Sequence, residues 1–261
     1  MDLGLKGRIA LVTGASRGIG AAIARVLAGE GMSLMLVARS TDGLEETAAA
    51  VRAAGSEAAT HPADLRRPEA AGAAVADAIA RFGRLDLLVN CAGATKRGDF
   101  LALTDEDWAD GYALKLHGAV RMCRAAWPHL VASHGAVVNI AGAGGRVASA
   151  DFTIGGSVNA ALMNFTKALA DRGVKDGVRV NCINPGLIAT DRLAARVRAR
   201  AAELGADEAA GAASLAEEHG IGRIGAPEEI GRVVAFLASE HAAGYVQGAL
   251  WDVDGGWVRA V

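Results

Sequence analysis

The chain has 261 residues, a formal net charge of −2 and 52% hydrophobic residues, of which few are aromatic. Acidic and basic residues are interspersed, so the sequence has no basic segment typical of a nucleic-acid-binding protein and we expect no nucleic-acid partner. No apolar run is long enough to cross a bilayer, and the first apolar segment begins near Arg8, so we expect neither a membrane span nor a secretory leader. These features predict one cytoplasmic α/β domain over residues 1–261 that acts on a small molecule.

Short apolar segments alternate with helix-length segments along the chain. Strongly apolar strands are predicted within residues 8–14, 33–39, 85–90, 135–141 and 178–184, and weaker ones within 57–64 and 249–256. Helices are predicted within 18–29, 41–54, 68–81 and 105–131, and Thr104 begins a segment close to a capping box. Repeated β-α-β order implies a Rossmann-type, doubly wound parallel sheet with helices on both faces. Residues 191–221 break the alternation, and their helix-prone, Ala-rich composition predicts a substrate lid.

The three cysteines, Cys91, Cys123 and Cys182, are widely spaced and form no CxxC pair. We expect them to be reduced and mostly buried. No cluster of His, Cys and Asp has the spacing of a metal site, so no metal is expected.

Residues 12–20, VTGASRGIG, place glycines at 14, 18 and 20 between the first predicted strand and the first predicted helix. Glycine permits a tight turn and close approach of the backbone to a pyrophosphate, and the helix N-terminus offers free N–H groups. A glycine turn can also serve packing alone. Its position directly between strand and helix favours a dinucleotide site.

Arg17 and Arg39 favour NADP(H) over NAD(H). The second predicted strand ends in Ala38-Arg39, without the acid that would hold the ribose 2′-hydroxyl of NAD. Arg17 lies in the glycine turn and can reach the same side. Two guanidiniums offer paired donors to a 2′-phosphate, although either arginine alone would be typical of a solvated surface.

Over nearly its full length, the sequence resembles the short-chain dehydrogenase/reductase family, and several motifs of the family occur here in the same order. Residues 13–20 resemble its TGxxxGIG turn, residues 90–93 its NNAG segment with Cys91 in place of the second Asn, and residues 184–190 its PG segment. Residues 222–239 and 253–256 resemble the closing segments of the family. The resemblance implies a seven-stranded sheet and a homodimer or homotetramer.

The resemblance also implies a set of cofactor-binding residues. Asp64 and Leu65 would meet the adenine ring, and Thr190 the nicotinamide carboxamide. The full predicted set is Gly14, Ser16, Arg17, Gly18, Ile19, Gly20, Arg39, Asp64, Leu65, Asn90, Ala92, Gly93, Asn159, Pro185, Gly186, Ile188 and Thr190.

The family's proton-transfer tetrad of Asn, Ser, Tyr and Lys is not matched at any position. By this resemblance Gly142 stands at the serine position, Gly155 at the tyrosine position and Asn159 at the lysine position. A tyrosine needs a nearby cation to lower its pKa, and neutral Asn159 cannot supply that charge, although it can hydrogen-bond ribose hydroxyls. Because two consecutive glycines disfavour a helix interior, we expect the helix to begin late, with Ser157 as its cap.

Lys115 takes the place of the active-site asparagine and is the candidate catalytic residue. If its helix keeps the family geometry, Lys115 points into the cleft toward the space that Gly155 and Asn159 leave empty. An ammonium there can donate a proton, polarise a carbonyl or bind an anion. The alternative is a lysine that extends to the surface.

Other polar residues near the cleft are weaker candidates. His117 lies nearly opposite Lys115 on the same helix, and His219 lies in the predicted lid. Ser149, Asp151 and Thr153 precede the altered helix and either line the pocket or are solvated. No Ser-His-Asp arrangement is indicated.

Three functions follow from these observations. The first is an NADP(H)-dependent oxidoreductase that reduces an activated C=C or C=O bond of an acyl thioester or ketone. The second is a non-catalytic nucleotide-binding protein, a sensor or partner subunit, and the third is a non-redox lyase or isomerase. Retention of Asn90, Thr190 and the glycine turn counts against the third. The lid arginines either meet a carboxylate or a CoA phosphate or form a solvated helix face; they are Arg192, Arg196, Arg198 and Arg200.

Overall fold

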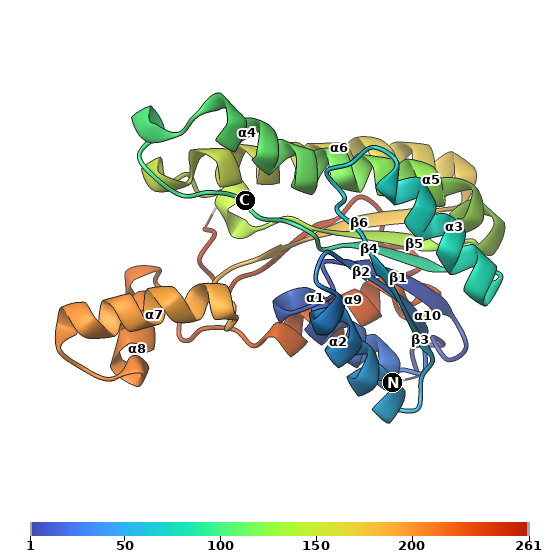
Figure 1. Ribbon diagram of the computed structural model, residues 1–261, viewed down its shortest axis with the longest axis horizontal. Helices are drawn as coiled ribbons and strands as arrows, with labels where there is room; N and C mark the ends of the chain where they lie inside the picture. The colour runs from blue at the N-terminus through green and yellow to red at the C-terminus, as the bar shows by residue number, and fades with distance from the viewer. Residues whose placement is uncertain (1, 260–261) are drawn as a thin grey trace.

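Seven parallel strands form one sheet in the order β3-β2-β1-β4-β5-β6-β7 (Figure 1). The structure is a computed structural model that describes residues 2–259. The strands are β1 (Ile9–Thr13), β2 (Ser33–Ala38), β3 (Ala58–Pro62), β4 (Leu87–Asn90), β5 (Ala136–Ile140), β6 (Arg179–Pro185) and β7 (Leu250–Val253). All seven predicted strands are therefore confirmed, including the two with weaker patterns.

Helices cover both faces of the sheet (Figure 1). One layer contains α1 (Gly18–Gly29), α2 (Thr41–Ala53), α9 (Pro227–Ala238) and α10 (Glu240–Ala243). The other contains α3 (Ala70–Phe82), α4 (Asp105–Tyr112), α5 (Gly118–Ser133) and α6 (Thr153–Asp176). Successive strand residues point to opposite faces, so Val12 packs in the core beneath α1 and Leu11 in the core beneath α3 and α5. This explains why the strands are apolar throughout.

The predicted helix within 105–131 is divided into three parts. Thr104 begins α4 with a capping box, in which its Oγ1 accepts from the Asp107 N–H at 3.3 Å and the Asp107 carboxylate accepts from the Thr104 N–H at 3.1 Å. A π-helical turn, Ala113–His117, then separates α4 from α5 and carries Lys115. Such turns are rare and occur often at functional sites.

Helix α6 begins at Thr153, and the expectation that Ser157 would cap a late-starting helix is wrong. Ser157 lies inside the helix, and its hydroxyl donates to the Ile154 carbonyl at 3.0 Å. The first turn is held by tertiary packing, because Ile154 is fully buried and the Phe152 ring lies against Gly155. These contacts offset the low helix propensity of the two glycines.

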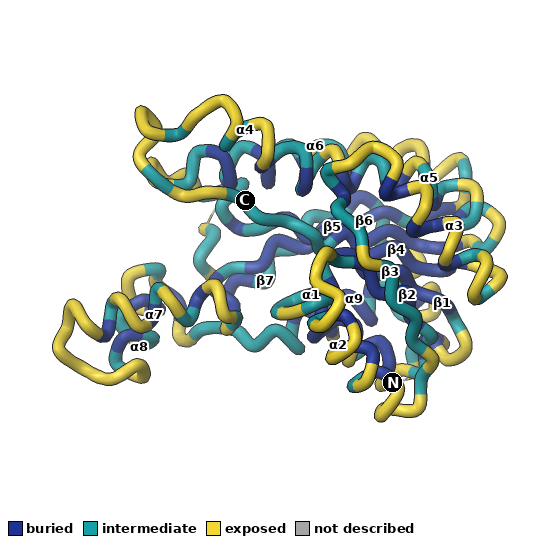
Figure 2. Tube along the Cα trace, viewed as in Figure 1, coloured by how far each residue is buried: buried dark blue, intermediate teal, exposed yellow. Residues whose placement is uncertain are grey.

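Helices α7 (Asp191–Leu204) and α8 (Glu208–Glu218) fill the predicted lid segment and project away from the sheet (Figure 1). They have a small apolar core of their own, built mainly from Leu193, Val197 and Leu215. Their far ends are exposed (Figure 2). Of the helices within residues 2–259, none is both long and apolar enough to span a membrane.

Candidate functional site

The candidate site lies at the carboxyl ends of the strands, where the strand order reverses between β1 and β4. In doubly wound sheets this edge is where ligands bind. The predicted cofactor residues follow β1, β2, β3, β4 and β6, apart from Asn90 at the end of β4, Pro185 at the end of β6 and Asn159 on α6. The topology thus places segments far apart in the sequence along one edge of the sheet.

The glycine turn packs backbone to backbone against the loop after β4. Gly14 has φ +68°, and a Cβ there would lie 2.9 Å from the Cα of Ala92. A Cβ on Gly20 would overlap the Gly14 carbonyl, so neither position tolerates a side chain. The Thr13 hydroxyl joins the two loops by accepting from the Cys91 and Ala92 N–H groups at 3.0 and 3.1 Å.

Helix α1 begins directly at this turn with Gly18, and Ile19 packs partly against the core. Within residues 2–259 no side chain caps α1. Its first N–H groups therefore face the crevice without a side-chain acceptor, as an anion-binding helix N-terminus requires.

Arg17 and Arg39 are exposed on adjacent loops. A Cβ on Gly43 would lie 2.8 Å from the Ser16 carbonyl oxygen, so the glycine turn touches the start of α2, next to Arg39. Neither arginine forms an ion pair with another residue in the described range 2–259. Both guanidiniums are therefore available to a phosphate at this end of the crevice.

The loops after β3 and β6 complete the predicted nucleotide-binding edge. Asp64 accepts hydrogen bonds from the Arg66 backbone N–H and guanidinium at 3.1 and 3.3 Å, and Leu65 is buried. Thr190 precedes α7, and its methyl group lies 3.4 Å from where a Gly18 Cβ would be. Pro185 and Ile188 are buried, and Gly186 packs tightly on the Asp254 backbone.

Asn90 belongs to a buried polar chain behind the site. Its amide donates to the Asn139 Oδ1 at 2.9 Å, and the Asn139 amide donates to the Thr166 hydroxyl at 2.9 Å. The chain ties β4 to β5 and α6, while the Asn90 Oδ1 has no partner among the described residues. Sequence reasoning missed Asn139 and Thr166; the only signal was a polar residue within each apolar segment.

We call the part of the crevice around Gly155, Asn159 and Lys115 the reactive end. It is not empty, contrary to expectation, because Phe152 fills the space beside Gly155. A Cβ on Gly155 would overlap the Phe152 ring, and one on Gly144 would lie 2.9 Å from it. The Arg97 guanidinium covers the same ring at 4.0 Å from its centroid, a cation–π contact. Sequence reasoning missed both residues, since no local pattern brings the loop after β4 to the start of α6.

Asn159 has the properties of a ligand-binding side chain. It is 3% exposed, and its Oδ1 has no hydrogen-bond partner within residues 2–259. A Cβ on Gly142 would lie 3.0 Å from its Nδ2, so the two residues adjoin. Because an unpaired buried acceptor is costly, a bound ribose hydroxyl would fit this position.

Lys115 extends across the carboxyl ends of β4 and β5. Its stem packs on Gly93, where a Cβ would lie 3.1 Å from the lysine Cδ, and its Nζ donates to the Ala141 carbonyl at 2.7 Å. Burial lowers the pKa of Lys115 to about 8, against a smaller opposing effect of Cys91, while Arg192 adds to the lowering. An ammonium with this pKa can exchange protons near neutral pH.

The weaker candidates lie around this centre or outside it. His117 is exposed, and His219, after α8, packs edge-on against Trp257 with ring centroids 4.6 Å apart. Asp151 is bonded to Ser149 and to Arg97, whereas the buried Thr153 hydroxyl has no partner among the described residues.

The cysteines are free, and Cys123 and Cys182 are buried, as expected, while Cys91 is half-buried. Burial raises the pKa of each thiol to about 12. Residues 2–259 contain no group of His, Cys, Asp and Glu arranged to hold a metal.

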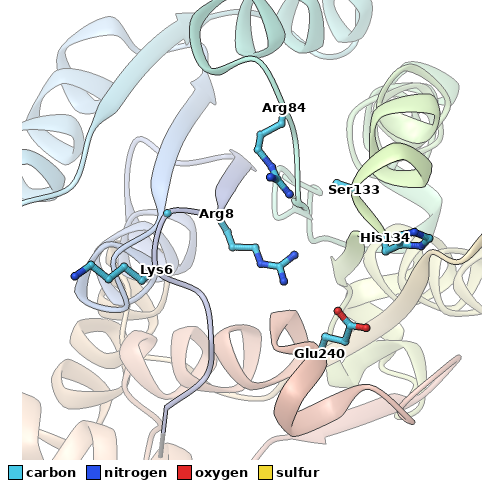
Figure 3. Close-up of a pocket in the computed structure, with 7 residues that line it drawn as sticks. Lys6, Arg8, Arg84, Ser133, His134 and Glu240 are labelled. Atoms are coloured by element: carbon cyan, nitrogen blue, oxygen red, sulfur yellow. The ribbon is translucent and has the colours of Figure 1, made fainter.

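A polar groove of about 470 Å³ lies at the opposite, amino-terminal edge of the sheet (Figure 3). Arg8, Arg84 and Glu240 point toward its centre (Figure 3). Both arginines are already paired with the buried Asp86, Arg84 at 2.5 Å and Arg8 at 3.4 Å. The groove is therefore a structural ion-pair cluster, remote from the crevice.

Comparison with known proteins agrees with this geometry. The family described as enoyl-(acyl carrier protein) reductase matches residues 14–258. The short-chain reductase protein NovJ of Streptomyces niveus is 38% identical over 252 residues, which cover 95% of this chain and 93% of NovJ. The 3-oxoacyl-[acyl-carrier-protein] reductase FabG of Escherichia coli is 33% identical over 255 residues, covering 97% of this chain and 98% of FabG.

Solved structures give the same assignment. L-Sorbose reductase from Gluconobacter frateurii, in complex with NADPH and L-sorbose, superposes with a TM-score of 0.95 at 36% identity and full coverage of both chains. Levodione reductase gives 0.89 at 29% identity, covering 98% of this chain and 99% of the other. The chain therefore belongs to the short-chain dehydrogenase/reductase family of oxidoreductases.

Proposed function

We propose that the protein is an NADP(H)-dependent reductase with a non-standard site, in which Lys115 donates the proton that accompanies hydride transfer. Its substrate is an activated C=O or C=C bond of a ketone or an acyl thioester. The observation that carries the proposal is the Lys115 ammonium, which lies at the carboxyl edge of the sheet and whose one hydrogen-bond acceptor within residues 2–259 is the Ala141 carbonyl.

The cofactor half of the proposal is supported by the glycine turn after β1 and by Arg39 after β2, which together we call the phosphate end of the crevice. Arg17 and Arg39, which form no ion pair within residues 2–259, suit a 2′-phosphate. The Asn159 Oδ1, which has no partner in the same range, suits a ribose hydroxyl. The structure of L-sorbose reductase, which is similar over the full chain, contains NADPH. A bound nicotinamide would supply the hydride.

The catalytic half of the proposal depends on which helix supplies the positive charge in the cleft. By the family resemblance, asparagine is expected at 115 and lysine at 159, and this chain has the two residue types exchanged. The cation therefore comes from the π-helical turn between α4 and α5 instead of from α6. Lys115 is positioned to give its proton to an oxygen or enolate carbon that gains negative charge as hydride arrives, and to regain one from water.

The proposal is tested by incubating the purified protein with NADPH and paired ketone, 3-oxoacyl thioester and enoyl thioester substrates. The expected result is NADPH oxidation matched one to one by reduced product. NADPH binding without oxidation across all three classes would contradict it.

A second candidate, a nucleotide-binding protein without turnover, is favoured by Phe152. Its ring fills the space beside Gly155, where the family resemblance would place the side chain of the proton-donating tyrosine. This function expects NADPH to change assembly or the lid without being oxidised. Sustained, substrate-dependent NADPH loss excludes it.

A further inference from the structure

Three arginines form a row along one face of the lid helix α7: Arg192, Arg196 and Arg200. Their four-residue spacing places them on neighbouring turns of one face. The two ends of the row are committed to protein groups. Arg192 donates to the Gly93 carbonyl at 3.0 Å, and Arg200 pairs with Glu203 and Glu218.

Arg196, in the middle of the row, is half-buried and lacks a partner. It forms no hydrogen bond or ion pair with any side chain or backbone group in the described range. Burial and the like charge of Arg97 lower the pKa of Arg196, with smaller effects of Glu218, Asp151 and Arg200. Its guanidinium is therefore partly shielded from water and has free donors that can bind an anion through paired hydrogen bonds.

The acids near Arg196 are already engaged elsewhere. Asp151 accepts from Arg97 at 2.7 Å and also from Ser149, and Glu218 pairs with Arg200. Arg97 is itself held on the Phe152 ring at 4.0 Å. The Arg97 guanidinium, on the loop after β4, is near enough for its charge to lower the pKa of Arg196, and within residues 2–259 no acid pairs with Arg196.

This pair lies beside the reactive end of the crevice. Arg192 contacts Gly93, on which the Lys115 stem packs. Arg196 is one turn further out, about 6 Å along the helix axis at four residues of ~1.5 Å each. An anionic group bound by Arg196 would thus lie one helical turn beyond Arg192, which contacts the glycine on which the Lys115 stem packs.

We propose that Arg196, assisted by Arg97, binds an anionic group of the substrate, so that the substrate is a compact carbonyl compound with a carboxylate or phosphate a few bonds from its reacting carbon. This inference rests on the proposed function, whose substrate class it narrows. The planar guanidinium can hold either anion through two parallel hydrogen bonds.

The test uses binding, so it is independent of turnover. Calorimetry compares 4-oxopentanoate with its methyl ester, and dihydroxyacetone phosphate with dihydroxyacetone, on NADPH-saturated and on nucleotide-free protein. We expect the charged member of one pair to bind at least about tenfold more tightly than its neutral partner. The pair that shows the preference identifies the anion as carboxylate or phosphate.

Arg196→Gln should abolish this preference and leave the affinity for NADPH unchanged. Arg198→Gln, which removes an exposed arginine from the same helix, is the matched control and should keep the preference. Equal binding of charged and neutral probes, no binding of either charged probe, or a preference that survives Arg196→Gln would overturn the inference. Weaker NADPH binding by Arg196→Gln would also overturn it, by assigning the arginine to the cofactor. A preserved charge preference without any NADPH oxidation would instead refute the proposed function alone.

Discussion

The phosphate end and the reactive end of the crevice are built in different ways. At the phosphate end, Gly14 and Gly20 bring backbone against backbone, and no side chain fits between them. At the reactive end, the contacts are between side chains, such as the Phe152 ring against Gly155 and the Lys115 stem against Gly93. Where backbone packs on backbone, glycine is required. Where side chains pack on one another, residues from other segments can occupy the same space.

On the proposed function, this difference would let the crevice combine a conventional nucleotide edge with an altered reactive centre. The Phe152 ring packs against Gly155, so the space beside this glycine is filled. The ammonium of Lys115 comes from a different helix from the one that the family resemblance predicts. The two ends should therefore respond differently to substitution.

Lys115→Met should have the largest effect and should confine it to the reactive end. Loss of a positioned proton donor lowers turnover by about 10²- to 10⁴-fold. NADPH affinity should change little, because the phosphate end is intact. Steady-state kinetics and NADPH titration check both values, with the exposed Lys167→Met as control. Unchanged turnover in Lys115→Met removes the lysine from the mechanism.

The pH dependence of reduction should report the same group. The pKa of Lys115 is lowered from 10.5 to about 8 by burial, so the proton donor is charged below pH 8 and is lost above it. We expect kcat/KM to fall about tenfold per pH unit above this value. A profile that stays flat to pH 10 would contradict the assignment.

Stability should change with pH in the opposite direction. Because the folded-state pKa of Lys115 lies below the unfolded value, the native protein binds fewer protons between about pH 8 and 10.5. The contribution of this group to the free energy of unfolding therefore rises with pH across that window. Denaturant unfolding of the wild type and of Lys115→Met measures the difference between them.

Asn159→Ala should affect both nucleotides equally, since the ribose is common to NADPH and NADH. We expect each affinity to fall about tenfold. Stability without nucleotide should not fall, because the substitution removes an acceptor that has no partner in the described structure. Thermal unfolding with and without NADPH separates the two effects, and the exposed Asn164→Ala is the control on the same helix. A loss confined to NADPH would move Asn159 away from the ribose.

Gly155→Ala should act on stability and have little effect on nucleotide binding. The added Cβ overlaps the Phe152 ring, which must shift, and we expect a loss of about 1–3 kcal/mol. Gly72→Ala in α3 is the matched control, because a Cβ there meets nothing within 4 Å and helix propensity should stabilise it by up to about 1 kcal/mol. Equal changes in the two variants would show that Phe152 does not fill this space.

The layout of the sheet could be predicted because its causes are local. Strands such as β1 are apolar on both faces, and the glycine turn lies directly between strand and helix. Free, largely buried cysteines followed from their spacing in the same way. These features need no knowledge of distant segments.

The reactive end could not be predicted to the same extent, because distant segments determine it. Phe152 and Arg97 are 55 positions apart and meet only in the fold. The start of α6 was placed too late, since tertiary packing of Ile154 outweighs the propensity of two glycines. Arg196 was one of four arginines in the predicted lid segment, and only the fold shows that it is half-buried while Arg192 and Arg200 are bonded to other groups.

The most direct test of the account is a calorimetric titration of the wild-type protein and of the double variant Arg17→Gln/Arg39→Gln with NADPH and NADH. We expect the wild type to bind NADPH at least about tenfold more tightly than NADH, and the double variant to lose that preference while retaining its affinity for NADH. Absence of binding to either nucleotide would contradict the account, because the crevice would then hold no nicotinamide cofactor for Lys115 to serve.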